Sequence, residues 1–130
     1  MNEEYINQTL PPLYFTKREL QIMMTLWKSD EPLSSYQIYE RTDDMSKNTI
    51  QQMLRKMHEE GFIKISGMGF TKNALTRKYE AAFSEEDYFI RMLSANGVPA
   101  MATKCISEIK SPKQLAHLKD LINNRLQTLA

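Results

Sequence analysis

The residues with the most suggestive chemistry in this sequence lie between positions 46 and 60, where amide and basic side chains recur with helical spacing. Apolar residues follow the period of an α-helix along one side of this stretch, and they are Ile50, Met53, Leu54 and Met57. The other side carries hydrogen-bonding side chains and no carboxylate before Glu59, namely Asn48, Gln51, Gln52 and Arg55, flanked by Lys47, Thr49 and Lys56. In the DNA major groove Asn or Gln can pair with adenine and Arg with guanine, and each good pair adds about 1–3 kcal/mol of discrimination. The pattern therefore predicts a helix that reads base pairs.

The charge of the chain is concentrated in the same region. The 130 residues have a net charge of +1, but residues 46–79 carry seven Lys and Arg against two Glu, a net charge of +5. Residues 1–45 have a net charge of −4, and residues 80–130 are balanced. A basic stretch is typical of a surface that meets a polyanion, although a solvated face with incidental charge is the alternative. Three basic residues beyond the polar helix are expected to contact phosphates or the adjacent minor groove and to set salt dependence: Lys72, Arg77 and Lys78.

Catalytic and metal-binding chemistry has no comparable pattern. His58 and His117 are far apart in the sequence, and His58 is followed by two glutamates without the second histidine of a zinc-protease motif. A glycine-rich phosphate loop is missing as well. Cys105 is the single cysteine, so it cannot form an intramolecular disulfide, and we expect it to be buried. We therefore expect no catalytic residue, no metal ligand, no cofactor and no enzymatic activity.

Length and composition narrow the class of protein further. A chain of this length allows one ordinary domain, or a small module with an appendix. Its 42% hydrophobic and 25% charged residues are typical of a globular protein. The apolar runs are far shorter than the ~18 residues of a membrane helix, and the first residues are acidic where a signal peptide is basic. The expectation is a cytoplasmic protein without a membrane partner.

Capping residues predict where the helices that position the polar helix begin. Thr16 and Glu19 form a capping box at the start of an amphipathic helix, and Asp30-Glu31-Pro32 ends it. Ser34 and Gln37 form a second capping box before a short helix. The polar helix, residues 46–60, is then the third helix, and a tight polar turn joins it to the second.

A two-stranded ribbon is predicted after the third helix. Gly61 is expected to end the helix in the left-handed conformation. Residues 62–65 have strand character, residues 66–69 resemble a flexible turn with two glycines, and residues 76–83 can supply a returning strand. Three helices followed by a ribbon are the winged helix-turn-helix arrangement.

The last third of the chain is predicted to be helical in three short segments. Ser84 with Asp87 begins the first of them, and Ser111 with Pro112 at the first helical position begins the last. These helices have too few apolar residues for a core of their own, which indicates self-association. The residues expected at the interface of two chains are Tyr88, Met92, Ile106, Leu115, Leu118, Ile122, Leu126 and Leu129.

The sequence thus predicts a mainly α chain with a small β-ribbon, in three parts. Residues 1–15 are expected to form an irregular N-terminal arm. Residues 16–83 are expected to form a winged helix DNA-binding domain. Residues 84–130 are expected to form a helical dimerisation region.

Five segments, in this order and spacing, resemble the penicillinase repressor family of the BlaI/MecI type. They are residues 16–27, residues 32–33, residues 46–63, residues 76–79 and residues 83–88. The resemblance covers about residues 15–127. It implies a homodimer that binds a palindromic operator in double-stranded DNA and represses transcription. The stretch from Ile65 to Thr76 is longer than the usual wing of the family.

Carried over onto this sequence, the resemblance makes residues 46–60 the reading helix. It places Lys47, Asn48, Thr49, Gln51 and Gln52 nearest the bases and Arg55 near the backbone, with Ser46 at the start of the helix. Repression in this family is often relieved by cleavage of an Asn-Phe bond. This chain contains no Asn-Phe dipeptide, so that route is not predicted, and no antirepressor is identified. It also lacks the Cys-x-Cys pairs of the copper-responsive branch.

Two other interpretations remain open at this stage. The chain can be a PadR-like or MarR-like regulator that senses a small hydrophobic ligand, in a pocket lined by Phe83, Tyr88, Phe89, Met92 and Met101. It can also be a winged helix used for protein contact, in which case the basic strip meets an acidic partner. A steep fall of DNA affinity with salt, together with preference for one operator, separates these interpretations.

Overall fold

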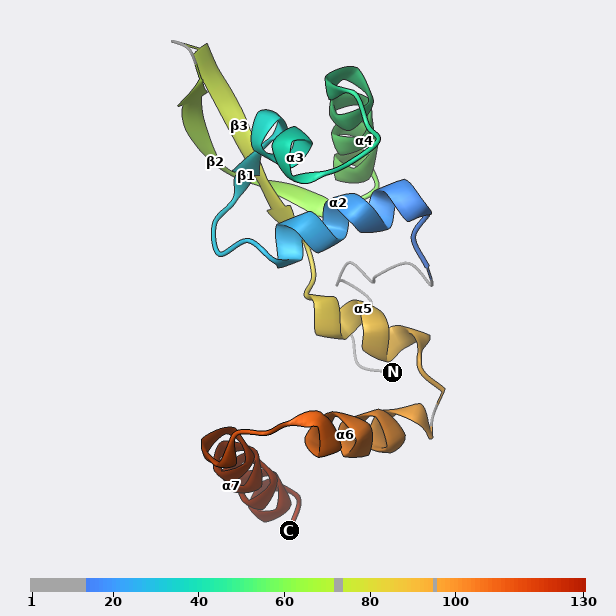
Figure 1. The fold of residues 1–130 in the computed structure, drawn as a ribbon, viewed down its shortest axis with the longest axis vertical. Helices are drawn as coiled ribbons and strands as arrows, with labels where there is room; N and C mark the ends of the chain where they lie inside the picture. Colours follow the sequence, from blue (N-terminus) through green and yellow to red (C-terminus); the bar gives the residue numbers. More distant parts are fainter. Residues whose placement is uncertain (1–13, 72–73, 95) are drawn as a thin grey trace. The chain divides into compact units, whose positions relative to one another are not determined.

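The computed structural model describes residues 14–71, 74–94 and 96–130 of the chain. It is mainly helical with one small antiparallel sheet, as the sequence predicts (Figure 1). The chain divides into two compact units, Met1–Met92 and Leu93–Ala130. Nearly all of the predicted N-terminal arm lies outside the described residues.

The first three described helices begin where the sequence places them. They are α2 (Lys17–Trp27), α3 (Ser35–Arg41) and α4 (Lys47–Glu59). Both predicted capping boxes are present, at Thr16 and at Ser34. At the start of α4 the Ser46 hydroxyl accepts a hydrogen bond from the backbone N–H of Thr49, at 3.1 Å. Each cap satisfies an amide that would otherwise lack a partner in the first helical turn.

The predicted left-handed ending of α4 is confirmed. Gly61 has φ 83°, a conformation that glycine adopts without steric cost. Its N–H donates to the carbonyl of His58 at 3.1 Å, and the N–H of Phe62 donates to the carbonyl of Met57 at 2.9 Å. This pair of bonds is a Schellman motif, which satisfies the last carbonyls of the helix and turns the chain directly into the sheet.

The sheet has three strands rather than the two predicted. They are β1 (Leu33–Ser34), β2 (Ile63–Thr71) and β3 (Ala74–Ala81), in the order β1-β3-β2 with antiparallel neighbours. The short strand β1 was missed because two residues are too few to show the alternation by which a strand is recognised. Its residue Leu33 pairs with Tyr79 of β3, which ties the start of α3 to the sheet.

The turn predicted at residues 66–69 is wrong, because the chain remains in β2 through these positions. Ile65 pairs with Tyr79 and Met68 pairs with Arg77, so two residues of β2 lie opposite one residue of β3. This is a β-bulge with one extra residue. Gly67 lies in it with φ 143°, which residues with a side chain rarely adopt. The glycines thus mark an irregularity within the ribbon instead of its end.

One apolar core joins the helices, the sheet and the chain before α2. Its largest fully buried side chains come from the described helices and from strands β1 and β2 of the first unit, and they are Ile22, Met23, Leu33, Ile38, Ile50, Leu54, Met57, Ile63 and Tyr88. Phe15, Met45 and Phe83 are buried beside them, from segments between the helices and strands. The core therefore closes around α4 from several sides.

Helix α5 (Glu85–Met92) is docked on this core by aromatic residues. Tyr88 is 2% exposed, and its ring lies 4.8 Å from that of Phe15, centroid to centroid. The Tyr88 hydroxyl accepts a hydrogen bond from the backbone N–H of Phe15 at 2.8 Å. The indole N–H of Trp27 donates to the Phe83 carbonyl at 2.9 Å. These contacts bring α5 into the same unit as the winged helix elements.

The start of α5 follows its predicted signal. The Ser84 hydroxyl accepts from the backbone N–H of Asp87 at 3.1 Å. A hydrogen bond from the Ser84 side chain, together with one from the backbone, lowers the pKa of the Glu86 carboxyl below its usual value. The carboxylate is also well placed there, because a helix N-terminus favours negative charge.

The second unit consists of α6 (Gly97–Glu108) and α7 (Pro112–Leu129). The Ser111 hydroxyl accepts from the N–H of Gln114 with Pro112 at the first helical position, as predicted. In this part of the described chain no residue of either helix is buried. The prediction that Cys105 is buried is therefore wrong, because the described residues of the second unit leave its side chain exposed. Among the described helices, none is long and apolar enough to cross a membrane.

The Tyr88 hydroxyl gives a first test of the packing. We expect Tyr88→Phe to lower the free energy of unfolding by about 1–3 kcal/mol, because the buried N–H of Phe15 loses its acceptor. Urea denaturation followed by circular dichroism measures the change. Tyr36→Phe is the matched control. The Tyr36 side chain is exposed, so this substitution should leave the free energy of unfolding unchanged. Equal stability of Tyr88→Phe and the original chain would show that the hydroxyl is not needed.

Candidate nucleic-acid interface

Helix α4 separates its side chains into a core face and a free face. Ile50, Leu54 and Met57 are buried, and Met53 is partly buried against them. This stripe recurs every three or four residues, which fixes the rotation of the helix about its axis. The polar side chains of α4 consequently point away from the core.

The predicted DNA-reading residues are placed together on this free face. Lys47, Asn48, Gln51, Gln52 and Arg55 are exposed. Ser46 and Thr49 differ from the other members of the set because their side chains are already engaged. The Ser46 hydroxyl caps the helix and also donates to the Thr49 hydroxyl at 3.0 Å, and Thr49 is half-buried. These two residues therefore stabilise the start of the helix, and their hydroxyl groups are less available for base contact than the exposed side chains.

Lys47 is held toward α3 by two aromatic rings. Its Nζ lies 5.1 Å from the ring centroid of Tyr36 and 5.4 Å from that of Tyr39. Such distances are typical of cation–π attraction. This pairing was not predicted from the sequence, although two tyrosines three residues apart on a short helix were a signal for it.

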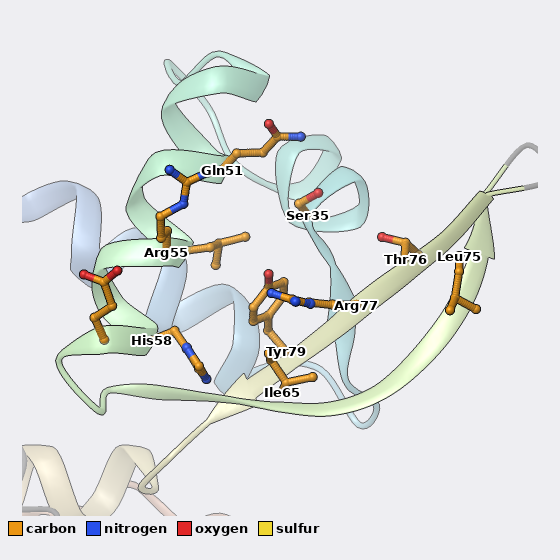
Figure 2. A pocket seen from close by; sticks show the side chains of 11 residues that line it. Ser35, Gln51, Arg55, His58, Ile65, Leu75, Thr76, Arg77 and Tyr79 are labelled. Atoms are coloured by element: carbon orange, nitrogen blue, oxygen red, sulfur yellow. The ribbon is translucent and has the colours of Figure 1, made fainter.

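A groove of about 470 Å³ lies between α4 and the β2–β3 ribbon, which is the wing (Figure 2). Arg55 lines it from α4, and Arg77 lines it from β3. Figure 2 shows the Arg77 side chain extending from the ribbon toward the helix, whereas the Arg55 guanidinium lies along α4 near Gln51. The remaining lining residues are Ser35, Gln51, Leu54, His58, Glu59, Ile65, Leu75, Thr76 and Tyr79. Two arginines on facing elements form a site suited to a phosphate-bearing ligand.

The basic residues of the wing do not all point into this groove. Arg77 and Lys78 are consecutive on a strand, so their side chains point to opposite faces of the sheet. Lys78 is half-buried, and a Cβ atom at Gly69 would lie 2.7 Å from its Cε, so the side chain passes directly over that glycine. On the same face as Lys78, Lys64 pairs with Glu80 at 3.1 Å. Lys72 lies outside the described residues.

Several groove residues were not singled out as DNA contacts from the sequence. His58 was interpreted only as a favourable charge for the helix end, yet it lines the groove together with Glu59. A signal was available, because His58 and Glu59 follow Gln51 and Arg55 at helical spacing on one face. The residues from β2 and β3 carried no such signal, since only the pairing of the strands brings them opposite α4.

The residues predicted at a dimer interface fall into two groups. Tyr88 lies in the core of the first unit and has almost no exposed surface. The others keep apolar surface, with Leu115 and Leu118 half-buried and a larger exposed set of Met92, Ile106, Ile122, Leu126 and Leu129. Among the residues considered for a ligand pocket, Phe83 and Tyr88 pack in the core, whereas Phe89, Met92 and Met101 are exposed.

Comparison with known proteins identifies the family of the chain. A search of curated proteins found no match to the chain. A sequence model described as penicillinase repressor matches residues 15–124, which include the described helices and strands of the first unit together with α6 and most of α7. That family consists of DNA-binding transcriptional regulators and not of enzymes. The chain belongs to the penicillinase repressor family.

Proposed function

We propose that the chain is a homodimeric transcriptional repressor that reads a palindromic operator with α4 and contacts the DNA backbone with the wing. The observation that carries this proposal is the free polar face of α4, which adjoins the groove between Arg55 and Arg77. Family membership supports the repressor role. In this proposal the protein acts on chromosomal DNA in the cytoplasm.

The N-terminal half of α4 is the part best suited to enter the major groove. Asn48, Gln51 and Gln52 are exposed there, and their amides can pair with base edges. The N-terminus of a helix also carries partial positive charge, which attracts phosphates. Glu59 and Glu60 lie at the opposite end of the helix. This asymmetry favours recognition by the start of α4, with its acidic end held away from the DNA.

The wing supplies contacts that do not depend on sequence. Arg77 extends into the groove from β3 and can meet a phosphate of the strand that α4 reads. Lys72 and Lys78 belong to the proposed contact set from the sequence, but Lys78 lies on the face of the ribbon opposite to Arg77. We therefore assign Arg77 the larger share of the electrostatic contribution.

The proposed dimer uses the C-terminal helices. Leu126 is 61% exposed and Ile122 is 51% exposed, and both lie on one stripe of α7. A stripe of this kind is usually covered by a second copy in a twofold-symmetric dimer. Two reading helices related by such an axis require half-sites whose centres lie about 34 Å apart, or a multiple of that distance. Residues 16–83 would then bind DNA and residues 84–130 would pair.

Substitutions in α4 should change mainly base specificity, whereas a substitution in the wing should change mainly DNA affinity. We expect Gln51→Ala or Asn48→Ala to lose about 1–3 kcal/mol of discrimination at one base pair with a modest loss of affinity. Arg77→Ala should weaken binding to all sequences alike and reduce the slope of log K against log salt by about 1. Fluorescence anisotropy on operator and random duplexes, at several salt concentrations, measures both effects.

Lys64→Ala is the matched control for Arg77→Ala. It removes the same charge from the same ribbon, but on the other face and from an ion pair with Glu80. We expect it to leave the salt slope nearly unchanged. The assignment of roles fails if the α4 and wing variants lose the same amount of base preference. The duplex for these measurements comes from footprinting the DNA upstream of the gene for this chain.

The dimer interface can be tested separately. We expect Leu126→Lys to turn a dimer into a monomer in analytical ultracentrifugation, because a charge would have to be buried in the apolar interface. Its affinity for a palindromic duplex should fall to that for a single half-site. Asn124→Lys is the control, since a helix places residue 124 on the side opposite to the stripe. A monomeric original chain, or a dimeric Leu126→Lys variant, would contradict the proposed interface.

A further inference from the structure

The wing carries an apolar face that becomes steadily more exposed away from the core. Along β2 the exposed fraction of the side chain rises from 2% at Ile63 to 37% at Ile65, 53% at Met68 and 81% at Phe70. Leu75, the partner of Phe70 on β3, is 60% exposed. Phe70 is the most exposed large hydrophobic side chain in the described part of the chain. Exposed apolar surface of this kind usually marks a contact site.

The β-bulge places these side chains on one face. Without it, the alternation of a strand would put Met68 and Phe70 on the face opposite to Ile65. The extra residue beside Gly67 shifts the alternation by one, so that Met68 pairs with Arg77 while Ile65 pairs with Tyr79. A bulge is known to re-aim side chains in this way. The irregularity in β2 therefore turns Phe70 to the same side as Arg77.

This face continues the proposed DNA-binding surface. Residues that pair across antiparallel strands share a face, so Phe70 and Leu75 lie on the side of the ribbon that carries Arg77. Leu75 and Arg77 also line the groove beside α4. The opposite face of the ribbon is polar, with Lys64 paired to Glu80. The apolar end of the wing thus overlaps the basic groove at Leu75.

We propose that Phe70, with Met68 and Leu75 beside it, inserts as an apolar wedge into the minor groove of the DNA next to the site that α4 reads. The inference rests on the proposed DNA-binding function. Phosphates give an exposed phenylalanine no favourable contact, whereas the faces of partly unstacked bases do. Proteins that kink DNA use Phe, Leu, Ile or Met for such insertion between base steps.

The reach of the wing fits this arrangement. Strands rise about 3.3 Å per residue, so Leu75 lies about 13 Å along β3 from Tyr79, and both residues line the groove. Half a turn of B-DNA, which separates a major groove from the next minor groove along the axis, is about 17 Å. The neighbouring Arg77 would hold the ribbon against the backbone between the two grooves. Contact with bases in both grooves then becomes possible for one chain.

The test compares Phe70→Leu with Phe70→Ser on the duplex that footprinting identifies. Its ends carry a fluorescent donor and acceptor to report bending, and 2-aminopurine replaces adenine at A·T pairs beside the footprint to report unstacking. We expect the original chain and Phe70→Leu to bend the duplex and raise 2-aminopurine fluorescence. Phe70→Ser should lose both signals and bind about tenfold more weakly. The salt slope should stay unchanged, because Phe70 neutralises no phosphate.

Tyr14→Ser is the matched control, because it removes an aromatic side chain of similar exposure, 76%, outside the wing. It should bend and unstack DNA like the original chain. The wedge is overturned if Phe70→Ser binds and bends the operator unchanged. It is also overturned if that variant alters only the sedimentation of the free protein, which would assign the face to a second copy. If the original chain bound no duplex at all, the proposed DNA-binding function itself would be contradicted.

Discussion

The burial of one side of α4 is the constraint on which the rest of this structure depends. Ile50, Leu54 and Met57 enter the common core, while the cap at Ser46 and the Schellman motif at Gly61 fix where the helix begins and ends. Rotation of the helix by one residue, 100° about its axis, would bury amide or charged groups without partners, at a cost of several kcal/mol. The core therefore fixes the direction of the polar face of α4, which in the proposed complex with DNA lowers the entropic cost of recognition.

The aromatic cluster around Tyr88 extends this rigidity to α5. It joins residues from before α2, from α2, from the segment after β3 and from α5 through ring contacts, one buried hydrogen bond and one partly buried hydrogen bond. Helix α5 was assigned to the dimerisation region from the sequence, and its packing makes it part of the same unit as α4. A dimer contact made through α5 would consequently act directly on the unit that contains the proposed reading helix. In a twofold-symmetric reader that connection matters, because the two helices must match the half-site spacing.

The wing shows how a small backbone irregularity changes the character of a surface. Regular alternation along β2 would divide its apolar residues between the two faces of the ribbon. One extra residue gathers them on the groove side and leaves the other face to the ion pair of Lys64 with Glu80. The same rule of alternation separates Arg77 from Lys78, which the sequence analysis had grouped together. The direction of a side chain in this ribbon thus follows from pairing with the neighbouring strand and not from residue type.

The sequence by itself determined the helices, their caps and the polar face of α4, because these depend on residues three or four positions apart, and it indicated the family through the order and spacing of its motifs. The wing was predicted as a ribbon, but its third strand, its bulge and the division of its basic residues were decided only by tertiary structure. So were the burial of Tyr88, whose hydrogen-bond partner Phe15 is 73 residues away, and the exposure of Cys105. Contacts between distant segments leave no periodic trace along the chain, and side chains acquire a common face only once the strands that carry them have paired.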